Sequence, residues 1–214
     1  MRAALLMLSV MCSGTLVACT AQEPSSAEPM SMRERLATET HLYVATSGSA
    51  GAITAQRRTD TGWAEQLVDL KLDGGELVTG AARGGMITLT TLELGFQTIT
   101  IPATVIGHEA QLTKPHLHLA APTAVAAAWS GDDSAEAGAE LDLELTWSLT
   151  VDGASLPIGA PDLPPLPVKL QLIGDGARIT AEIRVHAAGE VWNWADLVKL
   201  SDLELVLGAA TPAL

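Results

Sequence analysis

Cysteine, aromatic side chains and positive charge are all scarce in this 214-residue chain. Two cysteines cannot build a disulfide-rich scaffold. Lys and Arg number 12 against 25 Asp and Glu, which gives a formal net charge of -13. So acidic a surface excludes nucleic acid as a partner, because nucleic-acid binding needs a basic face. Hydrophobic residues nevertheless make up 48% and charged residues only 17%, a composition that favours a folded core over a disordered chain.

Long apolar runs are also missing beyond the N-terminal segment. There, Arg2 precedes the apolar residues 3–11, a run typical of a signal peptide and too short for the roughly 20 residues of a spanning helix. The longest later run, residues 119–129, is about half the necessary length and contains Pro122. The sequence therefore predicts a secreted chain with no membrane-spanning helix after its signal.

The N-terminal segment ends in Leu16, Val17, Ala18 and Cys19, which resembles the lipobox of bacterial lipoprotein precursors. In that family the cysteine thiol receives a diacylglycerol, the signal is cut just before it, and the new amine is acylated. The resemblance implies a signal peptide over residues 1–18 and a Cys19 that carries acyl chains such as palmitate. Two or more chains anchor a protein stably in a lipid bilayer. An ordinary secretory signal is the alternative interpretation.

Two neighbouring residues refine this expectation. Cys12 is a poorer lipidation site, because Ser9 stands where the lipobox has an aliphatic residue. Thr20, not aspartate, follows Cys19, and by resemblance to the sorting rule of enteric bacteria this favours the outer membrane, at its periplasmic or surface face, over the inner membrane. Residues 19–31 are small, polar and proline-containing, and they indicate a flexible tether.

The remaining residues, 32–214, are patterned as a β-rich extracytoplasmic domain. Apolar and polar residues alternate strictly over residues 141–151, and shorter copies occur at residues 168–172, 179–185 and 203–207. We expect a mainly β protein, an antiparallel sandwich or curled sheet. A capping-box pattern at residues 31–34 predicts a short N-terminal helix from Met32 to about His41, and a strand that starts near His41 is the alternative.

Turn and loop signals separate these segments. Gly-containing turns are expected at residues 73–75, 152–153 and 174–176. The acidic residues 130–138 are expected to form a solvated loop, and the proline-rich residues 156–167 an extended connection.

Two histidines are the candidate metal ligands. His116 and His118 are two residues apart, so on a strand their imidazoles share one face. Zinc sites usually need three or four protein ligands, and the alternative is a solvent-facing pair on an amphipathic strand.

Two tryptophans are the candidate ligand-binding residues. Trp192 and Trp194 would share a face of a strand, where they would stack on a ligand if exposed or fill the core if buried. Trp147 is in phase with the apolar face of residues 141–151, which places it in the core.

No catalytic motif and no cofactor-binding motif is present. The leading hypothesis is therefore a membrane-anchored, non-enzymatic domain that binds or scaffolds an envelope protein. A carrier of lipid or another apolar ligand is the alternative, and a metal-assisted enzyme using His116 and His118 is the third. A cavity lined by aliphatic side chains distinguishes the carrier from the scaffold.

Overall fold

A computed structural model of the chain describes residues 30–156, 163–194 and 198–212. The predicted signal peptide, Cys19 and most of the tether lie outside the described residues, as do residues 157–162 of the proline-rich connection.

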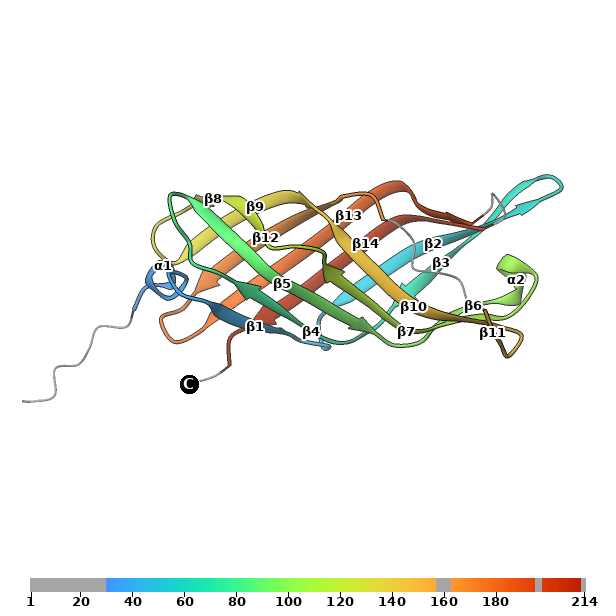
Figure 1. Cartoon of the computed structure of the whole chain (residues 1–214), viewed down its shortest axis with the longest axis horizontal. Helices are drawn as coiled ribbons and strands as arrows, with labels where there is room; N and C mark the ends of the chain where they lie inside the picture. Colours follow the sequence, from blue (N-terminus) through green and yellow to red (C-terminus); the bar gives the residue numbers. More distant parts are fainter. Residues whose placement is uncertain (1–29, 157–162, 195–197, 213–214) are drawn as a thin grey trace, which may run out of the picture.

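Eight antiparallel strands close into a barrel (Figure 1). Its order is β5-β4-β1-β14-β13-β12-β9-β8, and β8 pairs with β5 again through the register of Met86 with Ala126. The strands of the barrel are β1 (Thr40–Val44), β4 (Leu72–Thr79), β5 (Met86–Phe96), β8 (Thr123–Trp129), β9 (Ser134–Leu141), β12 (Leu166–Gly174), β13 (Ile179–Trp194) and β14 (Val198–Ala210).

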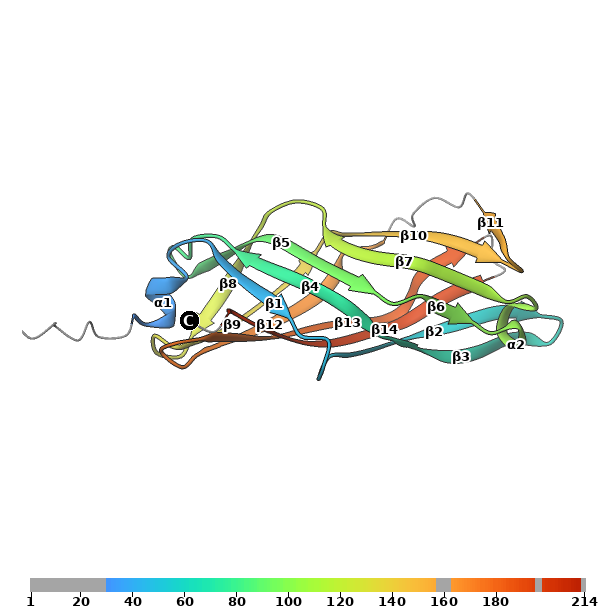
Figure 2. The same ribbon diagram turned by 90° about the horizontal axis from the view of Figure 1, so that it is seen from below.

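At one end the barrel opens into two layers, because β5 and β14 each change partner along their length. The last residues of β5 pair with β7, and the first half of β14 pairs with β2. Figure 2 shows β7 and β10 above and β2 and β3 below at this end. The strands outside the barrel are β2 (Ala50–Thr59), β3 (Gly62–Leu70), β6 (Ile99–Ile101), β7 (Ala110–Leu119), β10 (Leu143–Val151) and β11 (Ala154–Leu156).

The prediction of a mainly β, antiparallel fold is confirmed, but the sheet closes into a barrel, which is not quite the expected sandwich. Alternation fixes which face of a strand is buried and leaves open whether the edge strands meet. Here β5 and β8 meet, which removes two free edges. The helical turn α1 (Met32–Arg35) has four residues and a capping box at Ser31, much shorter than a helix reaching His41.

Two of the expected loops are strands. Residues 134–138, expected to be a solvated acidic loop, lie in β9, where Ala135 and Ala137 point into the barrel and Glu136 points out. Residues 73–75, expected to be a turn, lie within β4. A Cβ at Gly75 would lie 2.4 Å from the carbonyl oxygen of Glu93, so glycine here permits close pairing with β5 rather than a reversal.

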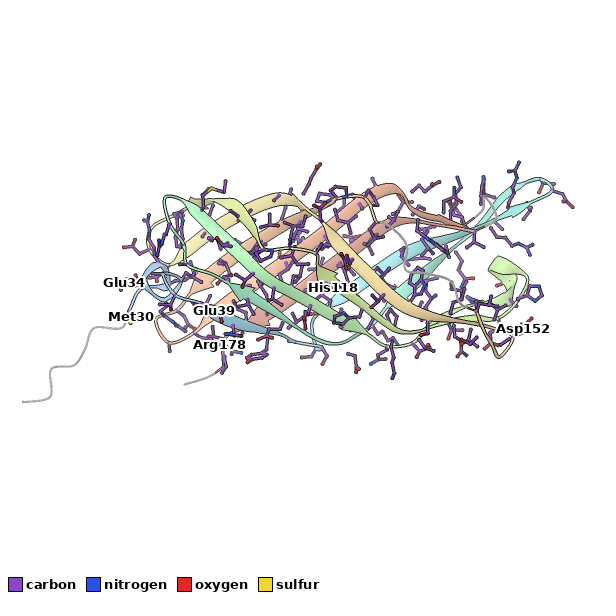
Figure 3. All side chains as sticks on the ribbon, in the orientation of Figure 1. Met30, Glu34, Glu39, His118, Asp152 and Arg178 are labelled. Atoms are coloured by element: carbon purple, nitrogen blue, oxygen red, sulfur yellow. The ribbon has the colours of Figure 1, made fainter. Side chains whose placement is uncertain are left out.

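The two short helices mark opposite ends of the molecule. α1 lies at the closed end of the barrel, and α2 (Ala103–Ile106) lies at the two-layered end in both views (Figures 1 and 2). With all side chains drawn, Glu34 marks the first end and Asp152 the second (Figure 3). Neither described helix has the length or the apolar character needed to cross a membrane.

Candidate functional site

An apolar cavity of about 60 Å³ lies between the two layers. One wall comes from β2, β3, β13 and β14, and the other from β5, β6, β7 and β10, with Leu163 beside them. The first wall consists of Ile53, Val68, Leu70, Val191, Trp192, Leu200, Leu203 and Leu205. The second consists of Phe96, Ile99, Ile101, Leu112, Pro115, Leu117, Leu145 and Trp147.

The composition of these walls decides what the cavity accepts. Every lining side chain is hydrocarbon, proline or tryptophan, and no polar atom faces the space. A buried water needs two to four polar partners, which this lining does not provide. The cavity is therefore suited to an apolar group and unsuited to ordered water.

Two tryptophans from opposite walls meet at the cavity. The rings of Trp147 and Trp192 are perpendicular, with centroids 5.3 Å apart, a favoured aromatic geometry. The Nε1 of Trp147 is buried and has no hydrogen-bond partner among the described residues. Of the two predicted ligand-binding tryptophans, Trp192 is half-buried and lines the cavity. Trp194 ends β13, and its side chain lies outside the described part of the structure.

Beside the cavity runs an open groove of about 390 Å³ between β3 and β6. These strands continue the paired strands β4 and β5 but separate from each other, after the amide of Gln97 donates to the carbonyl of Lys71 at 2.8 Å. β3 then pairs with β2, and β6 pairs with β7. Val68 and Ile99 line both the groove and the cavity, so these two buried side chains separate the groove from the apolar interior.

The predicted metal ligands lie on the outer face of β7. The ring centroids of His116 and His118 are 5.6 Å apart, and Leu117 between them points into the cavity. His118 Nε2 lies 3.1 Å from a carboxylate oxygen of Glu144 on β10 (the position of His118 is marked in Figure 3). In the part of the chain that the structure describes, no three His, Cys, Asp or Glu side chains gather closely enough to hold a metal ion. Metal binding by the pair stays a prediction.

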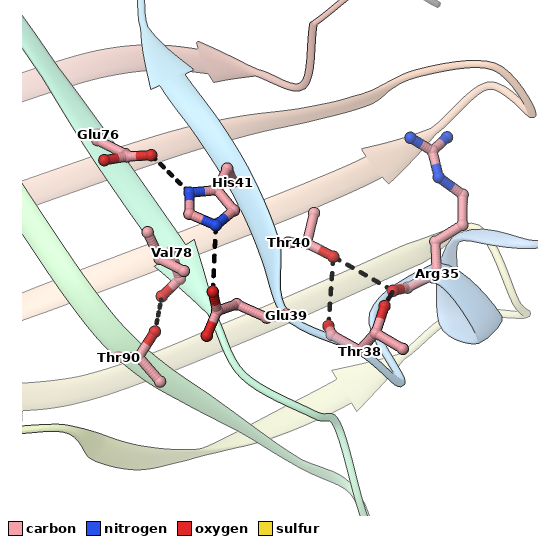
Figure 4. Close-up of polar contacts among 8 residues, drawn as sticks. All are labelled: Arg35, Thr38, Glu39, Thr40, His41, Glu76, Val78 and Thr90. Carbon is pink, nitrogen blue, oxygen red and sulfur yellow. Dashed lines mark hydrogen bonds and ion pairs between the residues drawn. The ribbon is translucent and has the colours of Figure 1, made fainter.

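A second histidine contact lies at the closed end. His41 Nδ1 is 2.6 Å from Glu76 Oε1, and its Nε2 is 3.2 Å from Glu39 Oε1 (Figure 4). The hydrogen bond to Glu76, helped by Glu39, raises the pKa of His41 above its ordinary value of 6.5. His41 lies at the closed end of the barrel and does not line the cavity. We therefore assign this cluster to stability rather than to ligand binding.

Sequence reasoning missed most of the cavity. Ile53, Leu117 and Leu205 are apolar strand residues like those of any core, and such a pattern does not tell a filled core from a hollow one. No protein family, curated protein or solved structure matches this chain, so the site is interpreted from its own geometry.

Proposed function

We propose that this protein is a lipoprotein anchored through Cys19 in the cell envelope, and that its barrel is a non-enzymatic carrier of an apolar ligand. The observation that carries the proposal is the cavity lined entirely by apolar side chains between the two layers. A domain that only scaffolds a partner gains stability by filling such a space, since every empty volume costs packing energy.

The two layers are able to part around a ligand. At this end β3 pairs only with β2 and β6 only with β7, so no strand pairing among the described residues joins the layers there. Among these residues the layers are held together there by side-chain packing. Pockets for whole small molecules measure about 300–1,000 Å³, so an aliphatic chain would widen the present 60 Å³ by separating the layers.

The point where the chain enters the described domain and the cavity lie at opposite ends of that domain. The chain enters the described domain at α1, and the cavity lies toward α2 (Figures 1 and 2). A tether of residues 19–31 reaches roughly 45 Å when extended. We propose the outer membrane, at its periplasmic or surface face, as the anchoring bilayer, with the cavity directed away from the attachment point.

Native mass spectrometry tests the carrier function. The mature chain, residues 19–214 with Cys19→Ser, would be purified without detergent and its native and denatured masses compared. We expect an excess mass that denaturation releases and that is identified as lipid. If the protein has the same mass under both conditions and binds neither dodecanol nor dodecanoate, the carrier proposal fails.

A second candidate is the binding or scaffolding of an envelope protein, favoured by the outer face of β3. Leu67 is 63% and Trp63 41% exposed, and β3 is an edge strand. Such an edge accepts a strand from a partner. A photo-crosslinker in place of Leu67 should capture one envelope protein reproducibly, whereas a crosslinker at Thr38, at the other end, should not. Equal labelling at both positions would contradict this role.

A further inference from the structure

A cationic side chain faces inward just beyond the apolar cavity. Ile53, Ala55 and Arg57 share the inner face of β2, and Ile53 lines the cavity. Ala55 is fully buried and pairs with Leu200, another cavity residue. Arg57 is therefore the second inward position beyond Ile53, toward the end that carries α2.

The opposite layer brings a glycine against this arginine. Ile101 lines the cavity at the end of β6, and the chain then passes through Pro102 and α2 to Gly107. A Cβ at Gly107 would lie 2.6 Å from Arg57 Nη1 and 3.8 Å from Cζ. The guanidinium thus rests on the bare backbone of Gly107, in space that any side chain there would occupy.

Among the residues that the structure describes, Arg57 has no counter-ion. Its Nε is buried without a hydrogen-bond partner, and no carboxylate of the described residues lies within the 4.0 Å of an ion pair. The carboxylate of Asp152 is held by the residues after Gly107 instead, since His108 Nδ1 lies 2.6 Å from it and the Glu109 amide donates to it at 3.2 Å. A half-buried cation with unsatisfied donors is costly unless an anion completes it.

We infer that Arg57 binds the head group of the ligand, which is an amphipathic anion. Its aliphatic chain lies in the cavity, and its carboxylate or phosphate accepts hydrogen bonds from the Arg57 guanidinium. The planar fork of arginine matches both anions, and its long stem lies along apolar surface while the charged end meets the head group. This inference rests on the proposed carrier function and adds the chemistry of the ligand.

Dissociation constants of three ligands with the same chain test the inference. Dodecanoate, dodecyl phosphate and neutral dodecanol would be titrated, below micelle formation, into the mature chain with Cys19→Ser. We expect at least one anion to bind ten or more times tighter than dodecanol, and the tighter anion identifies the head group. Arg57→Gln should remove that preference and change the affinity for dodecanol by less than twofold.

Arg58→Gln is the matched control, because it changes the same charge on the neighbouring, outward-facing position of β2. It should leave all three affinities within twofold. Arg57→Lys keeps the charge but not the fork, and it should retain part of the preference. If dodecanol binds as tightly as both anions, or if Arg57→Gln and Arg58→Gln act alike, the head-group inference is wrong while the carrier function stands. If none of the three ligands binds, the head-group inference is wrong, and the carrier function fails with it when native mass spectrometry also shows no bound lipid.

The affinities for the anions and for dodecanol can also be compared in the protein that keeps Arg57, without any arginine variant. Should Arg57→Gln fail to fold, as judged by circular dichroism, the ratio of anion to alcohol affinity still decides the question. A ratio of one overturns the inference, and a ratio of ten or more supports it.

Discussion

The ring of Trp192 on β13 meets the ring of Trp147 on β10 edge to face, with centroids 5.3 Å apart. These strands belong to different layers, and no backbone pairing links them among the described residues. The tryptophan pair is therefore a contact that holds the two layers together across the cavity. Any ligand that separates the layers must also move this pair.

Truncation of one ring should weaken the fold at this end. We expect Trp192→Ala to lower the free energy of unfolding by about 2–3 kcal/mol, less than the ~3–5 kcal/mol of a fully buried tryptophan, because Trp192 is half-buried. Urea unfolding followed by circular dichroism measures this. Trp63→Ala is the matched control. Trp63 is 41% exposed and contacts Lys199 through a cation–π interaction, so its loss should cost only about 0.5–1 kcal/mol. Equal costs would mean that the pair does not join the layers.

A pair of glycines tests the close approach of β4 and β5. In Gly75→Ala the new Cβ would lie 2.4 Å from a backbone oxygen that cannot move without breaking the pairing. We expect a loss of about 1–3 kcal/mol in the free energy of unfolding, as for overpacking in a core. In Gly208→Ala the Cβ meets no heavy atom within 4 Å, and the change should be neutral or stabilising by about 0.4–1 kcal/mol. Thermal melting of both variants would show whether the difference has this sign.

The strands of this protein follow largely from local pattern, as β10 shows. Residues 143–151 keep their alternation, with Leu143 and Leu149 buried and Glu144 exposed. The expected turn at residues 152–153 is confirmed between β10 and β11, where Asp152 and Gly153 both have positive φ. Alternation and turn chemistry act over a few residues, so a sequence window contains them.

Closure of the barrel and the cavity depend on contacts between residues that are far apart in the sequence, so a short stretch of sequence does not reveal them. β9 was concealed because alanine is a weak apolar marker, so the Ala135 and Ala137 pattern looks like a small-residue loop. The pairing of β5 with β8 joins residues up to forty positions apart, as Met86 with Ala126 shows. Arg57 is in phase with Ile53 and Ala55 along β2, and this period of two was the available signal for an inward arginine. The role of Arg57 could be inferred only from its contact with Gly107, which forms when the chain folds.

Stability should depend on pH through His41. Its pKa is raised in the folded state by the hydrogen bond to Glu76, so the protonated form is favoured by folding. This contribution is fully present below the unfolded value of about 6.5 and is lost as the pH rises through the raised value. His41→Gln should therefore lower the melting temperature more at pH 5.5 than at pH 8. Glu76→Gln should act in the same way and add little to His41→Gln. A deficit independent of pH would exclude the charged pair.

Attachment to the membrane should depend on one of the two cysteines. Cys19 follows Leu16, Val17 and Ala18 in the lipobox pattern, whereas Cys12 has Ser9 in place of the aliphatic residue. We expect Cys19→Ser to abolish labelling by a palmitate analogue and to leave the signal peptide uncut, because both reactions need the thiol of that residue.

Cys12→Ser is the matched control and should be labelled, cut and fractionated with membranes like the unaltered chain. After expression in a Gram-negative host, intact mass measurement reads labelling and cutting, and cell fractionation reads membrane attachment. If Cys12→Ser and Cys19→Ser are both still cut and remain unlipidated, the segment is an ordinary secretory signal. The barrel would then reach its ligand as a free protein, without a fixed bilayer on the side of α1.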